Sequence, residues 1–281
     1  AFDKFKDALI AERACELAAA AIQEQFPDHR VVGAPLSDGG EGFCDILTNA
    51  ANGRFEKTVA RDPRGESSKV RLGFIEASKL SSLTRTTGEL PDTGRIAVIE
   101  MAAAAGLSCL APEDRDPWET STHGVGDMIL RAVEDGIDGI LLGIGGSATN
   151  DLGLGALQAL GLRFLDELGA VVERIRPSVW HRLVSIEGDL PELPPLRIAC
   201  DVDNPLLGTF GATQVFGPQK GFSSQDLQKA EQELARVARL FVKSMGCDQA
   251  LFGESGAGAA GGLGFGLRIA AGASFAPGFS L

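Results

Sequence analysis

The segment Gly139-Ile-Leu-Leu-Gly-Ile-Gly-Gly-Ser-Ala-Thr-Asn-Asp151 decides how the rest of the chain is interpreted. The apolar run from Ile137 to Ile144 predicts a buried strand that ends at Gly145-Gly146. Polar residues that favour helix starts follow, and Leu152 to Leu160 are apolar at helical spacing. A strand, a glycine turn and a helix N-terminus direct backbone N–H groups and the positive end of a helix dipole at one spot. We therefore expect a phosphate or carboxylate ligand at this turn.

A second interpretation of the same segment is open. It matches neither G-x-G-x-x-G nor G-x-x-x-x-G-K-[ST], so no standard nucleotide-binding fingerprint applies. Glycines also stand at strand-to-helix turns where the backbone alone needs them. On this segment by itself, an anion site and a purely structural turn are equally good interpretations.

Composition and charge exclude several classes of protein. The 281 residues suffice for one large domain or two ordinary ones, and 44% apolar with 23% charged residues is typical of a globular protein. The net charge of −12 argues against a nucleic-acid-binding protein, which would need a basic face. The sequence shows neither an apolar run of membrane-spanning length nor a signal peptide, so we expect a cytoplasmic protein with no membrane partner.

The cysteines and the chain ends lead to two further expectations. Five scattered cysteines, without metal-ligand spacing and with only three histidines, argue against a zinc site or a disulfide framework and favour buried free thiols in a reducing compartment. The chain starts at Ala1 without Met and stops at Ala276-Pro-Gly-Phe-Ser-Leu281, so we expect residues to be missing from both ends.

Strand and helix patterns alternate along the chain, which predicts an α/β protein. Helices are expected at residues 9–26, 43–50, 120–134 and 223–245, and a buried helix at the glycine-rich stretch 256–272. Strands are expected at residues 30–36, 55–60, 69–76, 95–101, 162–165 and 196–200. The pair of strands around Asp62-Pro-Arg-Gly65 does not fit a simple strand–helix–strand series and suggests a change of domain there.

Several polar, glycine-bearing segments stand at strand or helix ends and could converge on one cleft. These segments are Asp3–Lys6, Ser37–Gly42, Gly145–Asp151, Cys200–Gly208 and Phe216–Gly221. Ligands of open α/β sheets gather beyond the carboxyl ends of the strands, where such loops lie.

Two aspartates in these segments are candidates for chemistry. Asp201 ends an apolar strand beside Asp203 and Asn204, so it could accept a proton or hold a metal ion; the alternative is a turn before Pro205. Asp38 has a similar ambiguity, because it could instead cap the next helix.

The lysines in the same segments carry two interpretations each. Lys4 and Lys6 stand just before a helix, where a cation is unfavourable beside the dipole, so an anionic partner is a reasonable inference and a solvated side chain is the alternative. Lys220 has the same two interpretations. Together, cations, glycine loops and strand-end carboxylates suit phosphoryl transfer, which needs positioning, a metal ion and one carboxylate near the attacking hydroxyl.

The order of these motifs resembles that of the type I glycerate kinases. Phe5-Lys6 with Leu9 resembles D-S-F-K-G-S-L, and residues 35–42 resemble P-L-A-D-G-G-E-G. Residues 143–151 resemble G-I-G-G-S-A-T-N-D, and residues 199–208 resemble A-C-D-V-x-N-P-L-x-G. The segments 216–221 and 256–264 also fit, so the resemblance spans nearly the whole chain. The chain departs from the pattern at Lys4, where the family usually has Ser, and at Asp7-Ala8 in place of Gly-Ser.

The resemblance implies phosphorylation of glycerate with ATP and Mg²⁺, with 2-phosphoglycerate as the favoured product. It also implies two α/β domains with a cleft between them, a flavodoxin-like domain and a restriction-endonuclease-like domain inserted into it. The first would comprise residues 1–57 plus 274–281, and the second residues 58–273. A kinase for another small hydroxy acid and a non-catalytic, ligand-sensing relative are the alternatives.

On this hypothesis the candidate residues take the following roles. Asp201 would act as base or orienter for the glycerate hydroxyl, Lys6 would neutralise a carboxylate or the transferred phosphate, and Asp38 would position substrate or Mg²⁺. The residues expected to bind the nucleotide are Gly145, Gly146, Ser147, Thr149, Asn150, Asp151, Asn204, Gln219 and Lys220. The metal ligands and the oligomeric state stay open.

Overall fold

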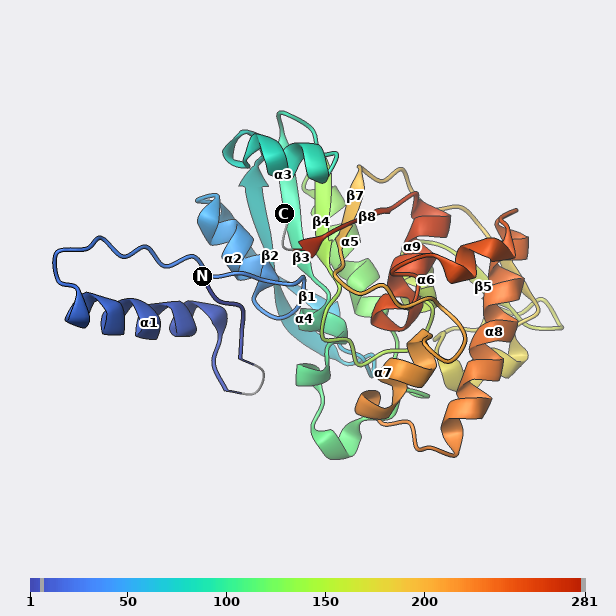
Figure 1. Ribbon diagram of the computed structural model, residues 1–281. Helices are drawn as coiled ribbons and strands as arrows, with labels where there is room; N and C mark the ends of the chain where they lie inside the picture. Colours follow the sequence, from blue (N-terminus) through green and yellow to red (C-terminus); the bar gives the residue numbers. More distant parts are fainter. Residues whose placement is uncertain (6–7, 279–281) are drawn as a thin grey trace.

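The computed structural model describes residues 1–5 and 8–278 and confirms the α/β class. A six-stranded mixed sheet has the order β1-β2-β3-β4-β7-β8 (Figure 1). The strands are β1 (Arg54–Arg61), β2 (Ser67–Glu76), β3 (Arg95–Glu100), β4 (Gly139–Gly143), β7 (Leu196–Ala199) and β8 (Ser274–Ala276). β1, β2 and β3 pair antiparallel, whereas β3, β4, β7 and β8 are parallel, so their carboxyl ends share one edge of the sheet.

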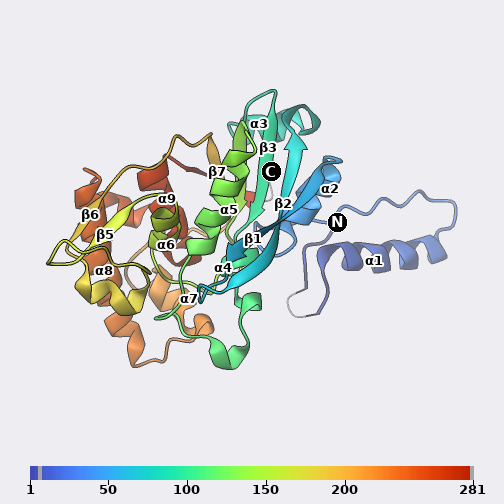
Figure 2. The same cartoon turned by 180° about the vertical axis from the view of Figure 1, so that it is seen from behind.

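Helices cover both faces of this sheet (Figures 1 and 2). The helices are α1 (Ala11–Gln25), α2 (Phe43–Ala50), α3 (Ser82–Thr87), α4 (Ala102–Ala105), α5 (His123–Glu134), α6 (Leu154–Ala159), α7 (Ala212–Lys220), α8 (Asp226–Ser244) and α9 (Leu263–Ala271). A small antiparallel pair, β5 (Arg163–Leu165) and β6 (Ser185–Glu187), lies apart from the main sheet.

The central strand β4 shows why these elements form. Ile140 and Leu142 belong to the larger hydrophobic core, whereas Leu141 between them belongs to the smaller core that contains Phe43 of α2. Successive side chains of a strand point to opposite faces, so a strand covered by helices on both faces must be apolar throughout. This is the reason that the opening segment is a continuous apolar run.

The N-terminal segment is the part that packs least against the rest. Figures 1 and 2 show α1 standing away from the sheet on an extended arm. Leu17 and Ile22 of α1 and Phe26 directly after it are exposed, although Ala14 and Cys15 are buried. The strand predicted for residues 30–36 does not form; Pro35 makes only an isolated bridge with Phe2, because no neighbouring strand runs along this segment within the described residues.

Two predicted elements differ in the structure. The stretch 256–272 is not one helix: Ala260, Gly261 and Gly262 have positive φ values of 51°, 65° and 88°, and α9 begins only at Leu263. The segment 216–221, predicted as a loop, is mostly the last part of α7, with Pro218 inside the helix. Glycine and proline are poor helix formers, so the local sequence did not indicate this part of the helix, which tertiary packing stabilises.

The predicted division into two domains stays a prediction. The boundary at residue 57 lies within β1, and β8, assigned to the first domain, pairs with β7 of the second. The five cysteines are free; Cys15 and Cys44 are buried as expected, whereas Cys109, Cys200 and Cys247 are only partly buried. Over the described residues, no helix combines the length and the apolar character needed to cross a membrane.

Candidate functional site

A cavity of about 130 Å³ lies where the parallel strands β4 and β7 end. Its lining comes from the end of β7, from the loops that follow β4 and β7, from the Ser37–Gly42 loop, from α7 and from the turn before α9. The lining residues are Asp38, Ile144, Gly145, Gly146, Ser147, Ala199, Cys200, Asp201, Val202, Phe216, Gln219, Ala259 and Ala260. The structure thus brings together segments that the sequence analysis expected to converge at the carboxyl edge of the sheet.

The glycine turn after β4 packs directly against the loop that carries Asp38. The Gly145 N–H donates a hydrogen bond to the carbonyl oxygen of Gly39 at 2.9 Å. A Cβ atom on Gly145 would lie 2.5 Å from the Gly40 Cα atom, closer than real Cβ atoms approach other atoms. Gly145 is therefore required for the close approach of two backbones, independently of any ligand.

Two residues next to this contact carry backbone N–H groups that are available for a ligand. The N–H groups of Gly146 and Ser147 find no hydrogen-bond acceptor within residues 1–5 and 8–278, and both residues line the cavity. Gly146 has a φ of +74°, the left-handed conformation that favours glycine. Successive backbone N–H groups in such a turn can bind an anion.

The helix dipole, in contrast, does not serve the cavity as expected. α6 begins at Leu154 rather than directly after the glycines and has six residues. Its first N–H groups are already satisfied by Asp151, whose carboxylate accepts hydrogen bonds from Gly153 and Gly155, both at 3.2 Å. An anion in this site would be bound by the turn, not by the helix N-terminus.

Asp151 is fully buried and links two helices. Its Oδ2 atom also accepts hydrogen bonds from the backbone N–H and the hydroxyl of Thr122, at 2.8 and 2.9 Å, just before α5. Burial raises the pKa of Asp151, and the N–H and O–H donors oppose that rise. Asp151 does not line the cavity, so its geometry here is that of a structural carboxylate.

Lys220 lies behind the glycine turn rather than in the cavity. The side chain is buried, and its ammonium donates a hydrogen bond to the Thr149 carbonyl oxygen at 2.6 Å. Burial lowers the pKa of Lys220 to about 7, although the nearby charge of Asp151 opposes this. Asn150 is buried beside it and donates to the Thr213 hydroxyl at 3.1 Å. Thr149, Asn150 and Lys220 therefore support the turn from behind.

This environment gives Lys220 a measurable effect on stability. The folded protein releases the Lys220 proton near pH 7, whereas an unfolded lysine holds it to about pH 10.4. Between these values the unfolded state binds more protons, so stability rises with pH by on the order of 1 kcal/mol per pH unit. We expect urea denaturation at several pH values to show this rise in the wild type relative to Lys220→Met. If the free energies of unfolding of the two proteins differ by the same amount from about pH 7 to 9, Lys220 does not have the lowered pKa described here.

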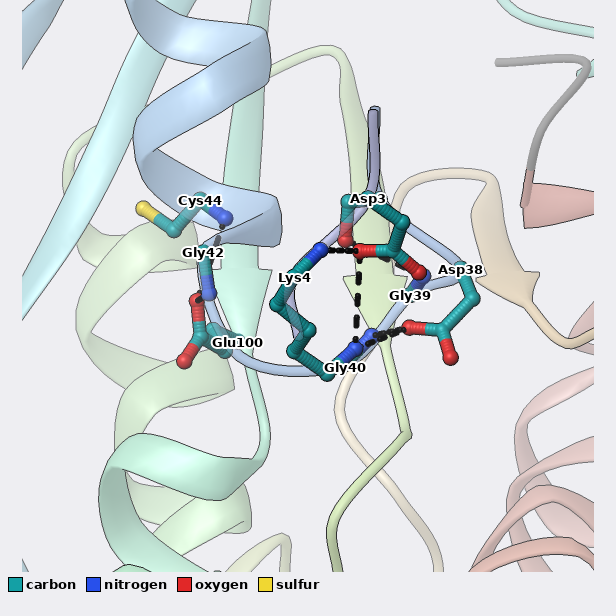
Figure 3. A network of polar contacts seen from close by, with 9 residues as sticks. Asp3, Lys4, Asp38, Gly39, Gly40, Gly42, Cys44 and Glu100 are labelled. Carbon is teal, nitrogen blue, oxygen red and sulfur yellow. Dashed lines mark hydrogen bonds and ion pairs between the residues drawn. The ribbon is translucent and has the colours of Figure 1, made fainter. Parts of the chain in front are cut away.

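Asp38 is paired within the protein. Its Oδ1 atom accepts hydrogen bonds from the Lys4 ammonium at 2.8 Å and the Gly40 N–H at 2.9 Å (Figure 3). Burial acts to raise the pKa of Asp38, but the hydrogen bond and charge of Lys4 outweigh it and hold the pKa below its ordinary value. Lys4, for which a solvated side chain or an anionic ligand was expected, has Asp38 as its partner. Lys6 and Asp7 lie outside the described residues.

Asp201 also lines this cavity and lies two residues after the end of β7. Its Oδ1 atom accepts a hydrogen bond from the Gly278 N–H at 2.9 Å, which ties the loop after β7 to the chain beyond β8. A Cβ atom on Gly278 would lie 2.6 Å from Asp201 Oδ2 and 2.8 Å from the Asp38 carbonyl carbon. Gly278 thus lies between the two aspartates that the sequence analysis selected.

The remaining candidates divide between the cavity and its surroundings. Gln219 lines the cavity from α7 together with Phe216, one helical turn earlier. Asn204 does not line it, and its amide donates to the Phe210 carbonyl oxygen at 2.8 Å, so it holds its own loop. Sequence reasoning missed Ala259 and Ala260, because the glycine-rich stretch there was expected to be a helix.

Comparison with known proteins places this geometry in a family. A model of the glycerate kinase family matches residues 1–281. The protein named glycerate kinase from Bacillus subtilis (strain 168) is 39% identical over 273 residues, which cover 94% of this chain and 65% of that protein. The "Glycerate 2-kinase" of Escherichia coli (strain K12) is 36% identical, with coverage of 99% and 69%. The chain therefore spans about two thirds of the length of these relatives.

A solved structure agrees with the sequence comparisons. The crystal structure called "putative glycerate kinase 2" from Salmonella typhimurium LT2 superposes with a TM-score of 0.80 at 34% identity. The match covers 99% of this chain and 70% of the other.

Proposed function

The chain belongs to the glycerate kinase family, and from this we propose that it transfers the γ-phosphoryl group of ATP to a hydroxyl group of glycerate. We favour 2-phosphoglycerate as the product, because one relative at 36% identity is named "Glycerate 2-kinase". The observation that carries the proposal is the cavity that Asp38, Asp201, Gly146 and Ser147 line together.

Each part of this cavity has a place in phosphoryl transfer. The N–H groups of Gly146 and Ser147 would bind phosphate oxygens, since they lack acceptors among the described residues. Gln219, which lines the cavity from α7, would contribute an amide. Catalysis of this kind rests on positioning and on compensation of charge, with little covalent chemistry for the protein to do.

The donor set fits Mg²⁺ shared with a nucleotide. Mg²⁺ usually binds through one or two carboxylates together with substrate phosphates and waters. Of the two carboxylates in the lining, Asp38 and Asp201, Asp38 would be the ligand from the protein, which leaves Asp201 for the proton. When bound, Mg²⁺ would neutralise charge on the phosphate oxygens.

We assign to Asp201 the role of general base for the glycerate hydroxyl. It would orient the glycerate hydroxyl and accept its proton while the hydroxyl oxygen bonds to the γ-phosphorus. The bond between that phosphorus and the bridging oxygen breaks, and ADP leaves with the electron pair. Asp38 would position the substrate or Mg²⁺, and Lys6 would neutralise a carboxylate or the transferred phosphate.

The direct test is release of ADP by the full chain from Mg-ATP, with and without D-glycerate. We expect release that depends on glycerate, and NMR of the product should place the phosphate on the 2-hydroxyl. Phosphate on the 3-hydroxyl would contradict the favoured product and leave the kinase assignment intact. A panel of other small hydroxy acids serves as the control for substrate identity.

The two alternatives give different results in the same assay. Release that another hydroxy acid stimulates more strongly than glycerate would identify a kinase for that acid. A folded protein that binds an anion without releasing ADP would favour a non-catalytic, ligand-sensing relative.

A further inference from the structure

Glu100 is a carboxylate near the cavity that the proposed reaction does not use. It is the last residue of β3, opposite Gly143 of β4, and is partly buried. Its Oε2 atom accepts hydrogen bonds from the backbone N–H groups of Gly42 at 3.1 Å and Cys44 at 3.3 Å (Figure 3). The carboxylate thus reaches from the central sheet to the start of α2.

Those hydrogen bonds serve a helix end that lacks a cap of its own. The residue before α2 is Gly42, with a φ of +91° and no side chain to accept a hydrogen bond. The first N–H groups of a helix need acceptors, and a negative charge beside them is favourable. Glu100 supplies both from another element of the fold.

The same contact fixes the loop that carries Asp38. Gly42 ends this loop, and the Gly39 carbonyl in its middle accepts the Gly145 N–H at 2.9 Å. Near its start, Asp38 pairs with Lys4 at 2.8 Å. A Cβ atom on Gly143 would lie 2.5 Å from the Gly39 carbonyl oxygen, so the loop has little room to shift toward β4. Glu100 is therefore one of the points that determine where Asp38 lies.

We propose that Glu100 is a positioning residue for phosphoryl transfer, whose carboxylate holds the Ser37–Gly42 loop so that Asp38 faces the cavity. This inference rests on the proposed function. A displacement of about 1 Å at a reacting group can lower a rate by about 10²-fold, so a residue that never touches substrate can matter for kcat.

The surroundings of Glu100 make its charge sensitive to pH. Burial raises its pKa to about 7, and the charges of Asp45 and Glu41 add to the rise, while the N–H groups of Cys44 and Gly42 oppose it. Asp45 lies on α2 and is itself paired with Arg71 of β2. Cys109, from the segment after α4, also lies within the electrostatic reach of Glu100, and burial raises the pKa of its thiol.

Protonation of Glu100 should weaken the contact without abolishing it. A hydrogen bond to a charged acceptor is roughly twice as strong as one to a neutral acceptor. The loop is then held less firmly below about pH 7, and kcat should show an acid limb with that midpoint. The free energy of unfolding changes with pH in the opposite direction to kcat. Because the pKa of Glu100 is raised in the folded protein, Glu100 favours folding at low pH, and this contribution is lost as the pH rises through about 7.

Glu100→Gln and Glu100→Ala separate these effects. Glutamine keeps an acceptor for both N–H groups but cannot titrate, so we expect its kcat to lack the acid limb and to stay within several-fold of the wild type. Alanine leaves both N–H groups without this acceptor, and we expect kcat to fall by about 10- to 100-fold with little change in KM. Glu192→Gln, an exposed glutamate outside the cavity, is the matched control and should behave as the wild type.

A readout that does not require turnover completes the test. In ¹⁵N NMR, the amide signals of Gly42 and Cys44 should titrate near pH 7 in the wild type and in Glu192→Gln, and should not do so in Glu100→Gln. An unchanged acid limb of kcat in Glu100→Gln, or amide signals that titrate as in the wild type, would overturn the inference. A wild type that titrates as expected yet releases no ADP would remove the proposed function instead.

Discussion

Asp201→Asn is expected to lower kcat for glycerate by about 10²- to 10⁴-fold while the protein stays folded. Asparagine has the shape of aspartate and keeps an oxygen that can accept the Gly278 N–H, the contact made by Oδ1 at 2.9 Å. It cannot take a proton from the glycerate hydroxyl. If Asp201 also contributes to substrate binding, KM will rise, but the larger change should be in kcat.

The neighbouring Asp203 provides a matched control for this substitution. Asp203 does not line the cavity, and its Oδ1 accepts a hydrogen bond from the Ser255 hydroxyl at 2.6 Å. Asp203→Asn removes the same charge two residues away, and we expect at most a several-fold change in kcat. Near-normal turnover in Asp201→Asn, or equal losses in both variants, would remove Asp201 from the role of base.

Asp151→Ala is expected to destabilise the fold by on the order of 3 to 5 kcal/mol. The substitution leaves the N–H groups of Thr122, Gly153 and Gly155 and the Thr122 hydroxyl without their common acceptor. It also removes the carboxylate whose charge raises the pKa of the buried Lys220. Urea denaturation at neutral pH, followed by circular dichroism, measures the loss.

Two further variants show whether the acceptor is responsible. Asp151→Asn can keep one oxygen at the position of Oδ2, which accepts three of the four hydrogen bonds, so its loss should be smaller. Glu192→Ala removes an exposed carboxylate and should change the free energy of unfolding by less than about 0.5 kcal/mol. A loss below about 1 kcal/mol in Asp151→Ala would show that the buried carboxylate is not a structural centre.

Much of the sheet and its cavity could be predicted from sequence, because local patterns carry that information. The run from Ile137 to Ile144 is apolar throughout, as a strand buried on both faces requires, and it contains β4. The strands around Asp62-Pro-Arg-Gly65 form the expected antiparallel pair. Asp201 and the glycine turn meet because the parallel neighbours β4 and β7 present their following loops at one edge. The loop with Asp38 joins them through the hydrogen bond from the Gly145 N–H to the Gly39 carbonyl oxygen.

The parts that were missed depend on contacts between distant residues. Gly217 and Pro218 are poor helix formers, yet they lie in α7, where a Cβ atom on Gly217 would be 2.9 Å from the Phe222 ring. No local pattern pairs Lys4 with Asp38 or Glu100 with Gly42. The burial of Asp151 and Lys220 and their hydrogen bonds within the protein have no local signal either, and their expected contact with a nucleotide stays a prediction.

The contact between Gly145 and Gly40 has a consequence for how such a sequence can evolve. A side chain at position 145 would collide with the backbone of the loop that carries Asp38. The effect of a substitution in either loop therefore depends on the residue present in the other, which is epistasis imposed by backbone proximity. We expect substitutions in one of the two loops to be tolerated only together with compatible residues in the other, although helices α2 to α5 and strands β1 to β4 separate them in sequence.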